Sequence, residues 1–261
     1  YEKRGITLTS CKFGDHQVFV RGVLGLDFSP DVLIVAVKAH QLEDALRGVK
    51  LDSSGLVIPI QNGCEHVKML TDQFGVSRVA VGAISLEAYR KETTHIVHSS
   101  TFVRLVLGVD SPGAYRKALR FAKLFEAMGV TVSVANGSLP VVWKKLVRLN
   151  AIACTTALSG LTVGEIRTDS HWRSVLFSIV REGVEVSKML GVPNSTSGVM
   201  AEIDSLPSSL TTSLARDIHL NRPSELDAIA GGVVRAGESF DLDCPIIREI
   251  MEEIKKKYKS K

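Results

Sequence analysis

The 261-residue sequence predicts an α/β sheet domain followed by an all-α domain. Between Asp31 and Val134, short β-rich runs alternate with helical ones, a rhythm typical of an open sheet with right-handed crossovers. After Pro140 the pattern becomes almost wholly helical. We therefore expect a sheet domain over residues 1–137 and a helical domain over residues 138–261, with the boundary near Gly137.

Strands and helices are expected to alternate through the sheet domain. The continuous apolar run 31–37 is typical of a parallel strand covered on both faces. After it we expect, in order, a helix over 41–49, a strand over 56–60, a helix over 65–73, a strand over 78–82, a helix from 111 to about 128 and a strand over 130–134. The runs 95–97 and 102–107 are expected to pair with each other as antiparallel strands.

Six helices are expected in the second domain, over 141–159, 170–190, 199–204, 209–219, 225–238 and 245–258. Gly191 and Pro193 should end the second of these, because glycine suits a helix C-terminus and proline cannot continue a helix. A sheet domain followed by a helical domain usually leaves a cleft, and ligands bind where strands end against it.

Composition excludes several classes of protein. The net charge of +4 is weak and no basic stripe carries interleaved aromatics, so no nucleic-acid partner is expected. No apolar run reaches the roughly 18 residues of a membrane span and no signal peptide is visible, so no membrane association is expected. The four cysteines contain no CxxC pair, which favours reduced thiols in a cytoplasmic protein without a metal site.

Polar residues follow two of the expected strands. Lys38 and Gln41 come after the first strand, and Asn62 and Gly63 follow the second. Ligands of open α/β sheets bind at the carboxyl ends of strands, so these residues are candidates for a binding site. Asn-Gly is also a common turn dipeptide, and Lys38 is equally compatible with a surface position at a helix start.

Lys144 and Lys145 stand on an otherwise apolar helix that runs on from Trp143. Burial of an ammonium group is costly, and proteins tolerate that cost where the ammonium has a role, such as giving a proton to a developing alkoxide. The alternative interpretation is that Lys144 and Lys145 both extend outward and serve only as surface charge. Further along, Glu225 and Asp227 open a helix after Pro223, where acidic residues also suit the helix dipole; Arg216 with Asp217 would make a structural ion pair.

Taken together, these segments resemble the ketopantoate reductase family over nearly all of the chain. The matching pieces, in order, are Val37-Lys38-Ala39-His40-Gln41, Gln61-Asn62-Gly63, Trp143-Lys144-Lys145, Leu161-Thr-Val-Gly-Glu165 and the run Ser213…Asp217…Arg222-Pro-Ser-Glu225-Leu-Asp227. The resemblance implies a Rossmann-type NADP-binding domain, a helical domain after it and an active site between them. It also implies NADPH-dependent reduction of a 2-oxo acid, ketopantoate or a related compound, to the 2-hydroxy acid.

The same resemblance implies a role for each matching residue. Lys145 matches the lysine that donates a proton to the substrate oxygen, which leaves Lys144 on the surface. The cofactor-binding positions are Lys38, Gln41, Asn62, Ala88 and Glu225, of which Ala88 would contact the cofactor through its backbone. Asn62 and Ser213 match substrate-binding positions, and Glu225 matches a glutamate that helps to orient the site.

Two features depart from the family pattern. No GxGxxG occurs in the sequence, and the chain begins at Tyr1, as if the first strand, helix and second strand of the Rossmann unit were absent; we expect a longer native chain. Leu149 and Ala153 stand where the family often has substrate-binding asparagines. Asn150 lies one step further, about 100° around the helix, so either a local shift brings it to the substrate or the substrate is not ketopantoate.

Two alternatives to a ketopantoate-type reductase follow from these departures. One is a non-catalytic or cofactor-deficient paralogue whose helical domain serves assembly or ligand sensing. The other is a different 2-oxo-acid or opine-type dehydrogenase of similar architecture. In each case the helical domain offers enough apolar faces for a homodimer.

Overall fold

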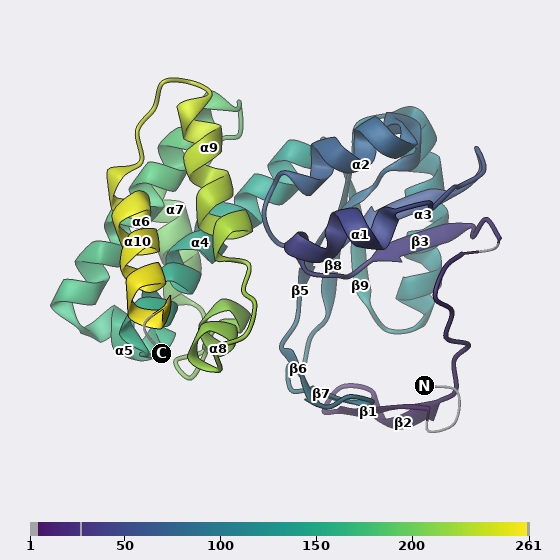
Figure 1. Cartoon of the computed structure of the whole chain (residues 1–261), viewed down its shortest axis with the longest axis horizontal. Helices are drawn as coiled ribbons and strands as arrows, with labels where there is room; N and C mark the ends of the chain where they lie inside the picture. Colours follow the sequence, from purple (N-terminus) through teal and green to yellow (C-terminus); the bar gives the residue numbers. More distant parts are fainter. Residues whose placement is uncertain (1–4, 27, 260–261) are drawn as a thin grey trace. The chain divides into compact units, whose positions relative to one another are not determined.

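The computed structural model describes residues 5–26 and 28–259, which divide into two compact units (Figure 1). Unit 1 comprises the chain up to Val35 together with Leu46–Ile60 and Leu70–Ser138. Unit 2 comprises Ala36–Ala45, Gln61–Met69 and the chain from Leu139 onwards. Along the chain, the main part of unit 1 ends at Ser138 and that of unit 2 begins at Leu139, while the segments 36–45 and 61–69 belong by their contacts to unit 2.

The main sheet of unit 1 is built from two groups of strands. In the first, β3 (Val32–Val35) pairs in parallel with β4 (Leu56–Pro59); in the second, β8 (Arg104–Val109) lies between antiparallel β5 (Val81–Ser85) and parallel β9 (Thr131–Asn136). A parallel bridge between Val57 and Val79 places the chain entering β5 beside β4. The strands therefore follow one another in the order β3, β4, β5, β8, β9.

Helix α3 (Pro112–Ala127) covers this sheet and fills its core. Ser111 begins it by accepting a hydrogen bond from the amide of Ala114, with proline in the first turn, where a missing N–H costs nothing. The buried face of the helix consists of Ala114, Ala118, Phe121 and Ala122, which pack with Leu56, Ile58, Leu105 and Leu107 of the strands. This spacing is that of an amphipathic helix, and its bounds agree with the helix expected from 111 to about 128.

A second sheet of unit 1 was not predicted. Its strands lie in the order β2 (Gly14–Val18), β1 (Ile6–Ser10), β7 (His95–His98), β6 (Ala88–Glu92). The expected pairing of 95–97 with 102–107 is wrong, because β7 pairs with β1 and β6, whereas β8 pairs with β5 and β9. An alternating sequence pattern predicts that a segment is a strand but does not predict which strand it pairs with. The residues that pair between β1 and β7 are more than 80 positions apart along the chain.

Short helices connect the strands of unit 1. They are the 3-10 turn η1 (Ala39–Gln41), α1 (Leu42–Leu46), α2 (His66–Phe74) and the 3-10 turn η2 (Val76–Arg78). The expected helix over 41–49 is thus shorter than predicted. The strand expected over 78–82 begins instead at Val81, since residues 76–78 form a turn.

Unit 2 is helical around the long helix α4 (Ser138–Ser159), which is buried over much of its circumference. The remaining helices are α5 (Val163–Thr168), α6 (Ser170–Met189), α7 (Thr196–Asp204), α8 (Ser213–His219), the π-helical turn η3 (Asp227–Gly231), α9 (Gly232–Glu238) and α10 (Pro245–Lys259). A sheet unit and a helical unit confirm the predicted fold class. In the described part of the chain, no helix combines the length and apolarity needed to cross a membrane.

Several helices of unit 2 differ from the prediction, and α7 begins at Thr196 instead of residue 199. The six-residue α5 was missed; Thr162 caps it through the amide of Glu165, and Glu165 binds back to the amide of Thr162. Helix α8 begins at Ser213 instead of residue 209, because Thr212 is its cap. The helix expected over 225–238 contains a π-helical turn, a feature frequent at functional sites.

Candidate active site

Lys145 and Lys144 have different environments on α4. Lys144 is exposed, whereas Lys145 is partly buried and donates a hydrogen bond from Nζ to Oδ1 of Asn62, at 3.1 Å. Burial, together with the charge of Arg148 and against that of Glu225, lowers the pKa of Lys145 to about 8. A lysine with this pKa is still largely protonated at neutral pH and gives up its proton far more readily than a surface lysine.

Asn62 connects Lys145 to Glu225. Its Oδ1 accepts from Lys145, and its Nδ2 donates to Oε2 of Glu225, at 3.0 Å. The Asn62 amide therefore accepts a hydrogen bond from the cationic lysine through its oxygen and donates one to the anionic carboxylate through its nitrogen. The three side chains form a continuous chain of hydrogen bonds from an ammonium to a carboxylate.

The segment after β3 joins the same network through its backbone and through Lys38. Oε1 of Glu225 accepts from the amide of Ala39 at 3.2 Å, and Oε1 of Gln41 accepts from the amide of Lys38 at 3.2 Å. The Lys38 ammonium donates to Oδ2 of Asp217 at 2.9 Å and to the carbonyl of Pro223 at 2.8 Å. Five residues predicted for the site, Lys38, Gln41, Asn62, Lys145 and Glu225, thus belong to one connected group within unit 2.

Gly63 lets the Asn62 segment approach the π-helical turn. Its φ is +88°, and a Cβ at this position would lie 2.6 Å from the carbonyl oxygen of Ala228. Only glycine meets both conditions without a shift of the backbone. Beside it, Gln61 donates from Nε2 to the carbonyl of Val37 at 2.8 Å, which ties the segments after β3 and β4 together.

Three other predicted residues are not joined to this group by a hydrogen bond among the described residues. Ser213 is exposed at the start of α8, four residues before Asp217 and therefore on the same face of the helix. Asn150 is fully buried; its Oδ1 accepts from the Cys154 thiol, and its Nδ2 has no partner. Ala88 belongs to unit 1, where β6 pairs it with His98. Their roles stay predictions.

The structure adds two residues that the sequence did not single out in this role. Asp217 was expected to pair with Arg216, and it pairs instead with Lys38. His66 is buried, its Nε2 has no partner, and burial together with the charge of Lys145 lowers its pKa to about 4. A neutral imidazole therefore lies near the candidate acid. The described residues contain no group of three or more His, Cys, Asp or Glu side chains suited to a metal ion.

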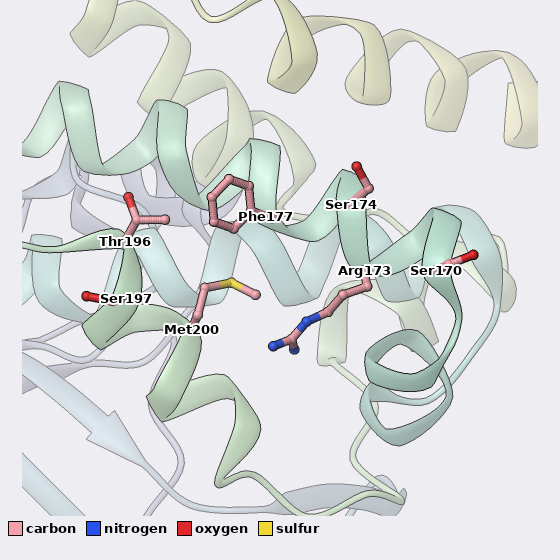
Figure 2. Close-up of a pocket in the computed structure, with 7 residues that line it drawn as sticks. All are labelled: Ser170, Arg173, Ser174, Phe177, Thr196, Ser197 and Met200. Atoms are coloured by element: carbon pink, nitrogen blue, oxygen red, sulfur yellow. The ribbon is translucent and has the colours of Figure 1, made fainter.

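A separate pocket lies on α6 and α7 of the same unit (Figure 2). It has a volume of about 790 Å³ and is lined by Ser170, Arg173, Ser174, Phe177, Thr196, Ser197 and Met200. None of the predicted site residues lines it, so it is distinct from the group around Lys145.

The donor set around Asn62 fits the nicotinamide end of a dinucleotide better than its pyrophosphate. The buried Oε1 of Gln61 has no partner and is free to accept a hydrogen bond from a bound amide or hydroxyl, whereas the Lys38 ammonium is already bound to Asp217 and Pro223. Asn62 and Glu225 add an amide and a carboxylate close by. The sequence has no glycine-rich GxGxxG to cradle a pyrophosphate.

Comparison with known proteins identifies the family. A family described as "Ketopantoate reductase PanE/ApbA" matches residues 1–111, and "Ketopantoate reductase PanE/ApbA C terminal" matches residues 139–258. A 2-dehydropantoate 2-reductase of Mycobacterium tuberculosis is 30% identical over 226 residues, which cover 83% of this chain and 72% of that protein. The chain belongs to the ketopantoate reductase family. It is accordingly an oxidoreductase that acts on CH–OH groups.

Solved structures of similar fold include other members of this enzyme class. The complex of D-mandelate dehydrogenase with NADH and anilino(oxo)acetate superposes with a TM-score of 0.91 at 17% identity, covering 99% of this chain and 86% of that one. A dimeric ketopantoate reductase from Staphylococcus aureus superposes with a TM-score of 0.83 at 21% identity, covering 98% and 88%. At these identities the likeness shows the fold: a Rossmann-like sheet domain and a helical domain.

Proposed function

We propose that this ketopantoate reductase family member catalyses the NADPH-dependent reduction of a 2-oxo acid, ketopantoate or a related compound, to the 2-hydroxy acid. The observation that carries the proposal is the chain of hydrogen bonds from Lys145 through Asn62 to Glu225. It presents an ammonium of lowered pKa, held by a neutral amide, in the helical unit of a reductase family.

Lys145 is proposed as the general acid. Reduction of a ketone places a hydride on the carbonyl carbon and leaves an alkoxide on the oxygen; bound NADPH supplies that hydride. The Lys145 ammonium stabilises the developing negative charge and transfers its proton to the oxygen, so the product is a neutral hydroxyl and the lysine becomes an amine. Water then returns the proton to the lysine. Asn62 and Glu225 hold the ammonium in place during this step.

Substitution of Lys145 tests this role, and Lys144 is its matched control. We expect Lys145→Ala to lower kcat by about 10² or more, the usual scale for the loss of a general acid, while cofactor affinity stays close to that of the wild type. Lys144→Ala changes the preceding, exposed lysine and should leave kcat almost unchanged. Near-normal turnover of Lys145→Ala in steady-state kinetics would exclude the proposed acid.

The substrate is proposed to be a 2-oxo acid whose side chain meets an apolar surface. Leu149 is one helical turn from Lys145 and Ala153 two turns, and both replace the asparagines often found in the family. Asn150 would restore a polar contact only if its buried amide turned toward the substrate. Relative kcat/KM values for ketopantoate and for 2-oxo acids with apolar side chains decide between a ketopantoate reductase and another 2-oxo-acid dehydrogenase.

We further propose a homodimer in the cytoplasm. The dimeric family member from Staphylococcus aureus supports the assembly. The cysteines Cys11, Cys64, Cys154 and Cys244 are free thiols, as a reducing compartment favours. Sedimentation equilibrium measures the assembly directly.

A further inference from the structure

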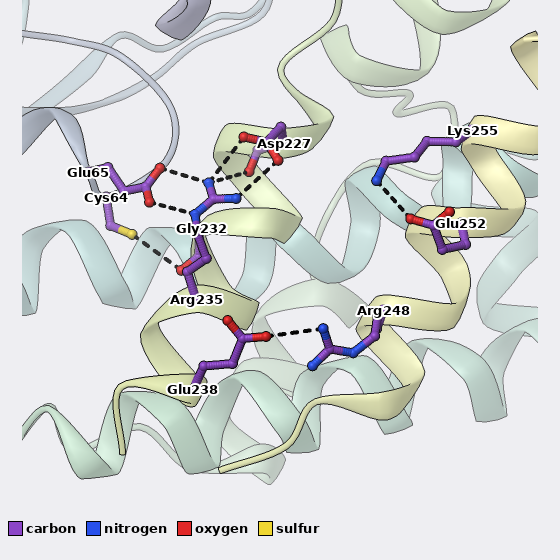
Figure 3. A network of polar contacts seen from close by, with 9 residues as sticks. All are labelled: Cys64, Glu65, Asp227, Gly232, Arg235, Glu238, Arg248, Glu252 and Lys255. Carbon is purple, nitrogen blue, oxygen red and sulfur yellow. Dashed lines mark hydrogen bonds and ion pairs between the residues drawn. The ribbon is translucent and has the colours of Figure 1, made fainter. Parts of the chain in front are cut away.

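A second polar network lies on the segments that carry Asn62 and Glu225 (Figure 3). The Arg235 guanidinium on α9 donates to both oxygens of Glu65, from Nε at 2.7 Å and from Nη2 at 2.8 Å. It also donates to both carboxylate oxygens of Asp227 at 3.1 Å and to the carbonyl of Asp227 at 3.2 Å. One guanidinium thus binds two carboxylates that are far apart in the sequence.

The backbones of the same two segments are in close contact. A Cβ on Gly63 would lie 2.6 Å from the carbonyl oxygen of Ala228, and a Cβ on Gly232 would lie 3.3 Å from the sulfur of Cys64. The Cys64 thiol is also oriented toward the carbonyl of Gly232, at 3.8 Å. The glycines at positions 63 and 232 therefore allow the two segments to lie close together, and the ion pairs of Arg235 with Glu65 and Asp227 hold the segments to each other.

The position of the network relates it to the candidate active site. Glu65 comes three residues after Asn62, and Asp227 comes two residues after Glu225. Arg235 therefore links the two segments that carry Asn62 and Glu225, whose hydrogen bond in turn contacts the Lys145 ammonium. A displacement of about 1 Å in such a group is enough to lower a rate severely.

We propose that Arg235 is a positioning residue for the Lys145–Asn62–Glu225 chain, acting through Glu65 and Asp227. The inference rests on the proposed reductase function. It assigns to Arg235 no contact with substrate or cofactor. Isolated ion pairs on the surface contribute little, but a planar guanidinium bound bidentately to two carboxylates is the geometry in which such pairs do matter.

Arg248 provides a matched control on the same unit. Its side chain is 48% exposed, against 42% for Arg235, and it also pairs with two carboxylates, Glu238 and Asp243, at 3.1 Å each. Neither of these carboxylates is near a predicted site residue in the sequence. The two arginines therefore resemble each other in exposure and in the number of carboxylates they bind, but only Arg235 binds carboxylates on the segments that carry Asn62 and Glu225.

Kinetics of matched variants test the proposal. We expect Arg235→Gln to lower kcat by about tenfold to a hundredfold, Arg235→Lys to recover part of that loss and Arg248→Gln to stay near the wild type. In an Asn62→Ala background, Arg235→Gln should have no further effect on kcat, because the hydrogen bond that it positions is already absent. Wild-type kcat in Arg235→Gln, or losses that simply multiply in the double variant, would overturn the proposal.

Hydrogen exchange provides a readout that does not need turnover. Arg235→Gln should accelerate amide exchange in the segment 61–69, and Arg248→Gln should not. Unchanged protection of 61–69 in Arg235→Gln overturns the positioning role whatever the kinetics show. If the wild-type enzyme reduces no 2-oxo acid while Arg235→Gln still loosens 61–69, the proposed function fails and the structural basis of the positioning role stands.

Discussion

Lys145 is the residue on which pH should act most directly. Because burial lowers its pKa to about 8, the ammonium that donates the proton is the main form below pH 8 and becomes scarce above it. We expect kcat for reduction to fall as pH rises through about 8, and the reverse oxidation, which needs the neutral amine, to rise over the same range. Rates measured between pH 6 and 10 in both directions check this.

Glu225 supplies the control for that pH profile. Its negative charge raises the pKa of Lys145 against the effect of burial. Glu225→Gln should therefore move the fall in kcat to lower pH, whereas Lys144→Ala should leave the profile in place. A reduction rate that stays constant from pH 7 to 10 in the wild type would contradict a Lys145 acid.

Individual site residues were predictable only through their arrangement along the chain. The polar residues after two strands, the lysine pair and Glu225 matched a family pattern. Five of these residues, Lys38, Gln41, Asn62, Lys145 and Glu225, belong to one connected group in the structure. Asp217 was assigned to its neighbour Arg216, since the sequence shows adjacent charges but not the distant Lys38. His66 and Arg235 were missed for the same reason: the charge of Lys145 acts on His66, and Glu65 binds Arg235, across more than 75 residues of chain.

Among the elements, the π-helical turn η3 and the Asn62 segment depend on Gly63. We expect Gly63→Ala to destabilise the fold and to lower kcat, because the added Cβ meets the carbonyl of Ala228 and the backbone has a positive φ. Gly75→Ala is the control: its φ is +84°, but a Cβ there meets nothing within 4 Å. Both variants introduce backbone strain, but only Gly63→Ala brings a Cβ against η3. A comparison of their thermal unfolding and their kcat therefore separates the effect of the strain from the effect of the steric clash. Equal losses of kcat would contradict a role for the close approach.

Elements with a strong local pattern were the predictable ones. Helix α3 has a capping serine, a proline in its first turn and a buried stripe at helical spacing, so its bounds followed from the sequence. Strand β7 has no such local constraint, and its partner β1 lies far away in the chain. The turn η3 was read as ordinary helix, because its amphipathic pattern does not distinguish a π-helical turn within α-helical sequence.

At the scale of the molecule, the two segments 36–45 and 61–69 interrupt the simple division at residue 137. They follow β3 and β4 of the sheet unit, yet they pack with the helical unit, which supplies Lys145 and Glu225. Sequence texture assigned them to the sheet, because a helical or polar segment between two strands reads as a crossover. The candidate site therefore lies within unit 2, where the two segments that follow strands β3 and β4 meet residues of the helices, an arrangement that composition alone does not reveal.

Cofactor binding by the whole 261-residue chain is the prediction that bears most on function. The free acceptor of Gln61 and the amide of Asn62 suit the amide of a nicotinamide, whereas the sequence lacks GxGxxG. We expect NADPH to bind with micromolar affinity in a fluorescence titration and Lys145→Ala to bind it equally well, because the lysine is proposed to serve the proton transfer. Tighter binding of NADH would correct the cofactor and leave the reductase proposal intact. If neither dinucleotide binds to a chain with a folded circular-dichroism spectrum, the reductase proposal fails for this chain and assembly or ligand sensing becomes the better account of its helical unit.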